Sequence, residues 1–128
     1  DSAAYERVRE MLYLYLPLAG VEDVRVGLVK SGRIAMYVKR GGLWTNAYNA
    51  GNYTRSVLPV LLQLLLANPT SAVFVDDVDL AVPGTHAEKL LSAFLDIARA
   101  KGLQLVLSAR EPAFAAAAEK LGMRVLSL

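Results

Sequence analysis

The sequence predicts an α/β fold: a mostly parallel sheet flanked by helices, with an antiparallel hairpin on its N-terminal side. Residues 72–76 are a continuous apolar run that ends in acids, which is typical of a strand covered on both faces, as in parallel sheets, and residues 103–108 are a second run that is predicted to be a buried strand. A helical pattern long enough for a parallel crossover separates these two runs. Earlier in the chain, two strand-like runs flank Ser31-Gly32, which predicts a hairpin with a two-residue turn.

The first half is predicted to contain a helix, the two hairpin strands, a short third strand and a second helix. These elements cover about residues 3–16, 24–30, 33–39, 43–45 and 55–67. Ser2 is a suitable cap for the first helix, and residues 17–20 end it. Residues 46–54 are polar and are predicted to form a loop. The helix that follows is apolar on nearly all sides, which predicts burial.

The second half is predicted to alternate strand, helix, strand, helix, strand. Thr85 and Glu88 form a capping box for a helix that runs to Lys101, and Gly102 ends it. Pro112 begins the next helix, and residues 123–128 are predicted to be a last strand. The inner stripe of the first of these helices is predicted to be Leu91, Phe94, Leu95 and Ala98. Since no linker divides the chain, residues 1–128 are expected to form a single α/β domain.

Composition narrows the functional classes. The chain has 128 residues, of which 55% are hydrophobic, and its mean hydropathy is +0.35. The richest apolar run, over residues 57–67, is shorter than the roughly 18 residues of a membrane span. There is no cysteine and only one histidine, so thiolate and histidine-cluster metal sites are excluded. The N-terminus resembles no signal peptide, so we expect a cytoplasmic protein. A net charge of +2 does not by itself indicate DNA as a partner.

Three acids follow the first predicted parallel strand. Asp76 and Asp77 end the strand, and Asp79 lies two residues further on. In open parallel sheets, ligands bind beyond the carboxyl ends of the strands, so these acids lie at the functional edge. One carboxylate, Asp76, is suited to hold Mg²⁺ through water, and Asp77 is suited to orient or deprotonate an attacking water. The alternative is that these acids solvate the strand end and cap the next turn.

Two other polar segments accompany these acids. Asn49-Ala50-Gly51 and Arg55 lie at the start of a helix, where free backbone N–H groups attract anions. Ser108 and Arg110 follow the second buried strand, so they are expected at the same sheet edge as the acids. Arg110 is suited to bind a phosphate, and Ser108 to donate a hydrogen bond. Taken singly, each segment is more typical of an ordinary turn.

Taken together and in this order, the three segments resemble the C-terminal lobe of ATP-binding-cassette-type AAA ATPases. The closest likeness is to the group of chromosome-maintenance, DNA-repair and overcoming-lysogenization-type proteins. Asn49-Ala50-Gly51 is similar to the signature loop Ser-x-Gly of that family, and residues 72–77 resemble its Walker B strand, which ends in Asp-Glu. Residues 108–112 fit the segment that carries the switch histidine, with Arg110 at that position. The resemblance covers about residues 43–128 and implies half of a P-loop NTPase fold.

The resemblance also implies how the site works. ATP lies between two subunits, with Mg²⁺ held by Asp76 and the attacking water positioned by Asp77. Asn49 and Gly51 reach across to a γ-phosphate, which Arg110 also approaches. We also expect Arg55, at the start of its helix, and Ser108, as a hydrogen-bond donor, to contribute to nucleotide binding.

Three departures from the family weaken the activity that the resemblance implies. Asp77 replaces a Glu, Asn49 a Ser and Arg110 a His, and misplacing a catalytic group by about 1 Å costs on the order of 100-fold in rate. The phosphate-binding motif Gly-x-x-x-x-Gly-Lys-Ser/Thr is also missing. We therefore expect no tightly bound ATP or Mg²⁺ on this chain alone, and hydrolysis only with an upstream nucleotide-binding lobe, a second copy in a homodimer, or both.

Several alternatives stay open. Because the chain begins at Asp1 rather than Met, we expect a piece of a longer ATPase, but a degenerate, non-catalytic interaction module is the rival. Trp44, Tyr48 and Tyr53 would suit a protein interface, and their alternative role is as core residues. A Toprim-type metal-dependent nuclease would use the spacing of Asp77 and Asp79, although the third acid that such a domain needs is missing.

Overall fold

The computed structural model describes residues 2–128, without the side chains of Ser2, Ala4 and Tyr5, so the predicted cap at Ser2 lies outside what is described. The chain divides into two compact units, residues 1–59 (unit 1) and 60–128 (unit 2). The boundary falls inside one helix, and the expectation of a single domain therefore stays a prediction. Within the described residues, no helix is long and apolar enough to span a bilayer.

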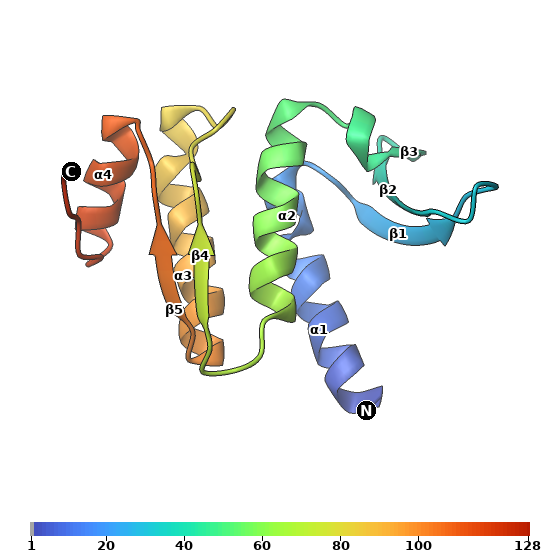
Figure 1. The fold of residues 1–128 in the computed structure, drawn as a ribbon, viewed down its shortest axis with the longest axis horizontal. Coiled ribbons are helices and arrows are strands. Elements are labelled where there is room, and N and C mark those ends of the chain that lie inside the picture. Colours follow the sequence, from blue (N-terminus) through green and yellow to red (C-terminus); the bar gives the residue numbers. More distant parts are fainter. Residues whose placement is uncertain (1) are drawn as a thin grey trace. The chain divides into compact units, whose positions relative to one another are not determined.

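Unit 1 contains a helix, a three-stranded antiparallel sheet and two 3-10 turns (Figure 1). Its elements are α1 (Ser2–Tyr15), η1 (Leu16–Ala19), β1 (Asp23–Leu28), β2 (Ile34–Arg40), β3 (Leu43–Asn46) and η2 (Ala47–Asn49). The helix α2 (Asn52–Leu66) begins in unit 1 and continues into unit 2. The sheet order is β1-β2-β3, which confirms both the predicted hairpin and the short third strand.

The hairpin turn is one residue longer than predicted. Val29 donates its N–H to the carbonyl of Arg33 at 2.9 Å, so three residues, 30–32, separate the paired positions. The last of them, Gly32, has φ 78°, a left-handed conformation that glycine adopts without strain. The prediction of a two-residue turn was wrong because Ser31-Gly32 matches the two-residue and the three-residue patterns equally well.

The core of unit 1 lies on one face of this sheet. Val38, in the middle of β2, is fully buried, as are Leu16 and Ala19 of η1. Two side chains of α2 fasten that helix to η1: the hydroxyl of Tyr53 donates to the carbonyl of Leu18, and the buried hydroxyl of Thr54 donates to that of Ala19, both at 2.8 Å. Burial raises the pKa of Tyr53, which favours its neutral, donating form.

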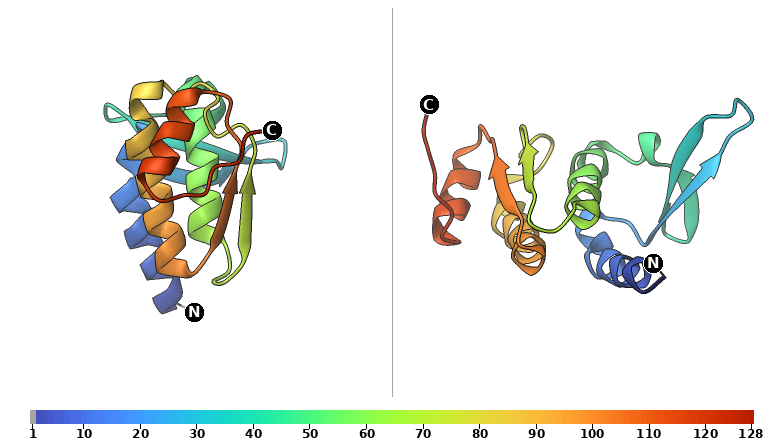
Figure 2. Two further views of the ribbon diagram at one scale, coloured as in Figure 1. Left: turned by 90° about the vertical axis from the view of Figure 1, so that its left-hand side faces the viewer. Right: turned by 60° about the horizontal axis from the view of Figure 1, so that its bottom comes forward.

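Unit 2 contains a two-stranded parallel sheet and its helices (Figures 1 and 2). After the end of α2 come β4 (Ala72–Val75), η3 (Gly84–His86), α3 (Ala87–Lys101), β5 (Gln104–Leu107) and α4 (Pro112–Lys120). Strands β4 and β5 pair in parallel with Ala72 opposite Gln104, as predicted for a crossover through α3. Of the predicted inner stripe, Leu91, Phe94 and Ala98 are buried and Leu95 is half-buried.

The sheet is not mostly parallel, which corrects the predicted fold class. Three of the five strands are antiparallel, and residues 123–128 form no strand. An apolar run becomes a strand only where a neighbouring edge offers unpaired N–H and C=O groups. In residues 123–126 the half-buried and exposed positions alternate, as in an extended segment, but no ladder forms. The sequence pattern therefore indicates an extended segment, but it does not show whether a neighbouring strand is present to pair with it.

The parallel sheet is covered on one face only. Val73 and Val75 point toward the core of unit 2, whereas Phe74 is 68% exposed and Val106 is 41% exposed. Helix α3 lies along the covered face (Figures 1 and 2). The prediction that both faces are buried was therefore wrong for this chain, although the apolar side chains that such burial requires are present.

The start of α3 also differs from the prediction. The short helix η3 leads directly into α3, the N-cap position is His86, and no side chain caps the helix. Glu88 instead accepts a hydrogen bond from Lys120 of α4 at 3.1 Å. The capping box at Thr85 fails because the 3-10 turn already supplies backbone partners at this end. Gly102 ends α3 with φ 65°, as predicted.

Lys101 joins the two helix ends of unit 2. Its ammonium group donates to the carbonyls of Leu64 and Leu65, at 2.9 and 2.6 Å, in the last turn of α2. Helix C-termini leave such carbonyls without intrahelical partners, and a cation complements their dipole. Desolvation nevertheless lowers the pKa of Lys101 because burial penalises the charged form more than the two carbonyls favour it.

Candidate functional site

Ser108 joins the carboxyl ends of β4 and β5. Its hydroxyl accepts the backbone N–H of Asp77 at 2.8 Å and donates to Asp76 Oδ1 at 2.5 Å. The strand ladder continues beneath this contact, since Ser108 N–H donates to Val75 O and Val78 N–H donates to Ser108 O, both at 2.9 Å. The predicted gathering of polar side chains at one sheet edge is therefore present for Asp76, Asp77 and Ser108.

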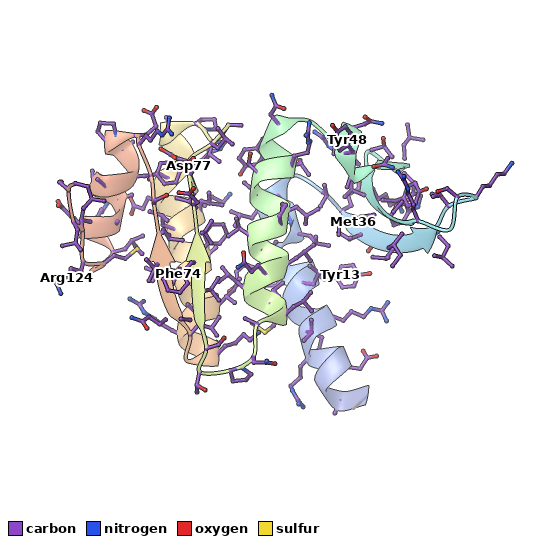
Figure 3. All side chains as sticks on the ribbon, viewed as in Figure 1. Tyr13, Met36, Tyr48, Phe74, Asp77 and Arg124 are labelled. Carbon is purple, nitrogen blue, oxygen red and sulfur yellow. The ribbon has the colours of Figure 1, made fainter. Side chains whose placement is uncertain are left out.

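Asp77 occupies a sharp turn directly beyond β4 (Figure 3). Its φ of 51° lies in the left-handed region, which Asp tolerates better than most residues. Asp76, directly before it, is exposed. Arg110 lies near Asp77, with Nε 3.6 Å from Oδ1, and their side chains are 86% and 39% exposed. Exposed pairs of this kind contribute less than about 1 kcal/mol, so an incoming phosphate can compete for Arg110.

Asp79 has a different role from the two acids before it. It is 8% exposed, and its Oδ2 accepts the backbone N–H groups of Arg110 and Glu111 at 2.8 and 2.6 Å. Charge-assisted hydrogen bonds to a buried carboxylate are strong, so Asp79 fixes the backbone that carries Arg110. This engagement also leaves Asp79 poorly suited to pair with Asp77 on a metal ion, as the nuclease alternative requires.

The metal-binding potential of this edge rests on a single exposed carboxylate. Among residues 2–128, no three Asp, Glu, His or Cys side chains converge as a metal-binding group. Mg²⁺ in nucleotide sites uses one or two carboxylates and takes its other ligands from water and phosphate oxygens. Asp76, oriented by Ser108, fits that limited requirement, and Mg²⁺ there would neutralise phosphate charge.

The other predicted residues lie in unit 1, at the start of α2. Asn49 ends η2 and is exposed, and Gly51 has φ 94° with open space where a Cβ would lie. Its carbonyl accepts the N–H of Arg55 at 3.1 Å, which begins the helix. The guanidinium of Arg55 stacks 4.4 Å from the ring centre of Tyr48, which is 72% exposed. This loop thus presents a cation, an exposed ring and a helix N-terminus together.

Side chains and backbone of unit 1 hold this loop in place. Asn46 Oδ1 accepts the N–H of Tyr48 at 2.9 Å, and Arg40 Nη1 donates to the carbonyl of Ala50. Ala50 itself is buried. The loop is therefore anchored at both ends, which fixes the approach to α2.

The predicted site residues thus form two groups. Asp76, Asp77, Ser108 and Arg110 gather at the strand ends of unit 2, and Asn49, Gly51 and Arg55 gather in unit 1. The sequence prediction missed the anchoring role of Asp79 and the stacking partner of Arg55. The sequence gives one signal for the role of Asp79, which is that it lies between the apolar residues Val78 and Val82. The structure shows that both valines are buried.

Comparison of the chain with protein-family models, with curated proteins and with solved structures found no match. Its function must therefore be inferred from its own residues.

Proposed function

We propose that this chain is the C-terminal part of an ATP-binding-cassette-type ATPase domain, carrying the Mg²⁺ and water half of a nucleotide site. The observation that carries the proposal is the Asp76–Ser108–Asp77 junction at the ends of two neighbouring parallel strands. Ligands of open parallel sheets bind beyond this end of the strands. ATP hydrolysis requires a ligand for Mg²⁺, a group that positions water and a cation that binds phosphate. The two carboxylates at this junction and the neighbouring Arg110 are suited to these roles.

Each residue has a distinct part in this proposal. Asp76 is the acid for Mg²⁺, and when that ion is bound it supplies charge neutralisation for the phosphates. Asp77 positions the attacking water. Arg110 leaves its weak pair with Asp77 for the phosphate, which frees that carboxylate to accept a hydrogen bond from water. Ser108 keeps the two strand ends in register.

The loop of unit 1 supplies the second part of the proposal. Asn49 and Gly51 would meet a γ-phosphate through backbone N–H groups at the start of α2, and Arg55 adds a cation. In the proposed arrangement these groups serve a nucleotide held by another lobe or by a second copy.

A partner is part of the proposal because the chain lacks the phosphate-binding motif. The exposed apolar face of β4 and β5 supports this, since Phe74 and Val106 are the kind of side chains that a covering layer buries. A non-catalytic interaction module would use the same face, and activity separates the two alternatives.

The test is ATP hydrolysis by the protein encoded in the complete reading frame, compared with its Asp76→Asn and Asp77→Asn variants. Each variant removes one negative charge and keeps the side-chain size, so a fall in kcat of at least about 100-fold is expected. Asp96→Asn, at an exposed position of α3, is the matched control and should leave kcat unchanged. Wild-type hydrolysis at the level of both site variants would reject the ATPase and favour the interaction module.

A further inference from the structure

Basic residues are concentrated in the middle of the chain. From residue 24 to residue 75 there is no Asp or Glu, but there are six basic residues: Arg25, Lys30, Arg33, Lys39, Arg40 and Arg55. Outside this stretch, the other eight basic residues stand against all twelve acidic ones. The small net charge of +2 therefore conceals a basic segment, which folds into the three-stranded sheet, apart from its first residue Asp23, and into the loop after it.

The sheet register sorts these residues by face. Val24 pairs with Val38, and Val38 is fully buried, so their face holds the core of unit 1. The opposite, outer face carries the alternate positions, where Arg25 pairs with Tyr37, and Lys39 pairs with Trp44 on one side and with the acid Asp23 on the other. Arg33 continues this face beside the hairpin turn, since it pairs with Val29. Cations and aromatic rings thus occupy neighbouring positions on one face of the sheet.

Both rings on the outer face are partly exposed, and Tyr37 is half-buried. Trp44 is 37% exposed, and the guanidinium of Arg25 lies over its ring, 4.5 Å from the centre. A flat cation on the ring shows that a planar group fits there. Next to it, a Cβ at Gly27 would lie 3.9 Å from the ring of Tyr37, so that ring borders the small residues Gly27 and Ala35. The ring of Tyr37 therefore lies against the backbone at Gly27.

We propose that the outer face of β1, β2 and β3 binds single-stranded nucleic acid. Bases would stack on Trp44 and Tyr37, while Arg25, Arg33 and Lys39 contact phosphates. Stacking of a base on an aromatic ring is stronger than an exposed cation–π contact, so a base displaces Arg25 from Trp44 and leaves its guanidinium for a phosphate. The proposal is independent of the nucleotide site in unit 2.

The placement of apolar side chains argues against a lipid surface as the ligand. Val26, Leu28 and Ile34 are more than half exposed, but the register puts them on the face opposite to the cations and rings. A bilayer would need both sets on one face. An acidic protein would be attracted by the cations but gives no reason for the rings beside them.

Trp44 is the only tryptophan, so its fluorescence reports directly on this face. The 128-residue chain is titrated with a 12-nucleotide oligo(dT) at low salt. Saturable quenching of Trp44 is expected because a stacked base quenches the indole. With three phosphate contacts, affinity should fall about tenfold when the salt concentration is tripled.

Variants separate stacking from charge, with binding followed by the anisotropy of a labelled oligonucleotide. Trp44→Ala should weaken binding about tenfold or more, whereas Trp44→Phe, which keeps a ring, should stay within about threefold of the wild type. Arg25→Gln with Lys39→Gln should weaken binding at least tenfold and lower the salt slope by about one to two. The matched control, Lys89→Gln with Arg124→Gln, removes two exposed cations of unit 2 and should change nothing. Circular dichroism checks that each variant is folded.

Three outcomes would overturn the proposal. The first is no quenching of Trp44 at any oligonucleotide concentration. The second is equal binding by Trp44→Ala and the wild type, with heparin competing as well as oligo(dT), which would mean attraction by charge alone. The third is binding to vesicles of anionic lipid in preference to the oligonucleotide.

Discussion

In unit 1 the outer face of the sheet carries Arg25, Lys39 and Trp44, whereas in unit 2 the uncovered face carries Phe74 and Val106. The first sheet is antiparallel and the second is parallel. Antiparallel sheets commonly leave one face in water, so a polar face is complete as it stands. Parallel sheets are normally covered on both faces, and an apolar outer face indicates that another layer belongs there.

The two units also use their sheets differently. Unit 1 offers a broad face with cations and rings on it, which suits an extended ligand. Unit 2 offers the ends of its strands, where Asp76, Asp77 and Ser108 meet, which suits a compact ligand such as a nucleotide. One helix, α2, begins in unit 1 and ends in unit 2, so the comparison can be tested by disturbing each unit separately.

The largest effect is expected from Phe94→Ala in α3. Phe94 is fully buried in unit 2, and removal of such a ring costs about 3–5 kcal/mol of unfolding free energy. Native-state hydrogen exchange should show a loss of that size for amides in α3 and β5, and a loss of under about 1 kcal/mol for the amide of Val38 in unit 1. An equal loss in both units would mean that they unfold as one cooperative body, and the division would then have no thermodynamic meaning.

The second-largest effect on the free energy of unfolding is expected from the removal of buried hydrogen bonds, and it should differ between the two units. Asp79→Ala leaves two backbone N–H groups without their carboxylate and should lower the free energy of unfolding by about 2–4 kcal/mol. Thr54→Val, which removes one neutral hydrogen bond to Ala19 in unit 1, should cost only about 1 kcal/mol. Urea denaturation measures both, with Asp96→Ala as an exposed control. Comparable losses for Asp79→Ala and Asp96→Ala would contradict the anchoring role of Asp79.

The contacts of Asp79 illustrate which features could be predicted from the sequence and which could not. The parallel pair and its polar strand ends could be predicted because continuous apolar runs and their last residues are local features of the chain. The bond from Asp79 to residues 110 and 111 could not, because it joins segments about thirty residues apart. For the same reason the sequence could not reveal that Ser108 bridges Asp76 and Asp77.

Other features were missed for a second reason: a residue's own sequence pattern does not show which segments lie next to it in the fold. Residues 123–128 have a strand-like pattern but no partner edge, and Phe74 has an apolar side chain but no covering layer. The outer face of unit 1 was missed because Arg25, Lys39 and Trp44 are scattered in the sequence and are collected only by the strand register. Charge summed over the whole chain hides such a collection.

Alkaline pH should affect the two units in opposite directions. Burial raises the pKa of Tyr53 above its ordinary value of 10.0, so its contribution to unit 1 is present below pH 10.0 and is lost as pH rises through the raised pKa. Desolvation lowers the pKa of Lys101 below 10.5, so the unfolded chain binds more protons between the two values, and unit 2 gains stability as pH rises there.

The measurement is urea denaturation at a series of alkaline pH values, with Trp44 fluorescence reporting on unit 1 and far-ultraviolet circular dichroism on the whole chain. Tyr53→Phe should flatten the fall seen by fluorescence, and Lys101→Met should remove the gain in unit 2. If the fluorescence midpoint of Tyr53→Phe fell with pH as steeply as that of the wild type, Tyr53 would not be the group that titrates.

The smallest effect concerns the strained turn that carries the proposed water-positioning acid. Asp77 and Ala81 both have left-handed φ values, 51° and 57°, which glycine adopts more easily. Ala81→Gly should raise the free energy of unfolding by up to about 1 kcal/mol, and Asp77→Gly by about half of that, because Asp tolerates this conformation better than Ala. Thermal denaturation measures both changes. The two variants should differ in function, since Asp77→Gly removes the carboxylate and Ala81→Gly does not. If Asp77→Gly lowered stability instead, the carboxylate would be holding the turn together through Arg110, and Asp77 would be explained as a structural residue of unit 2.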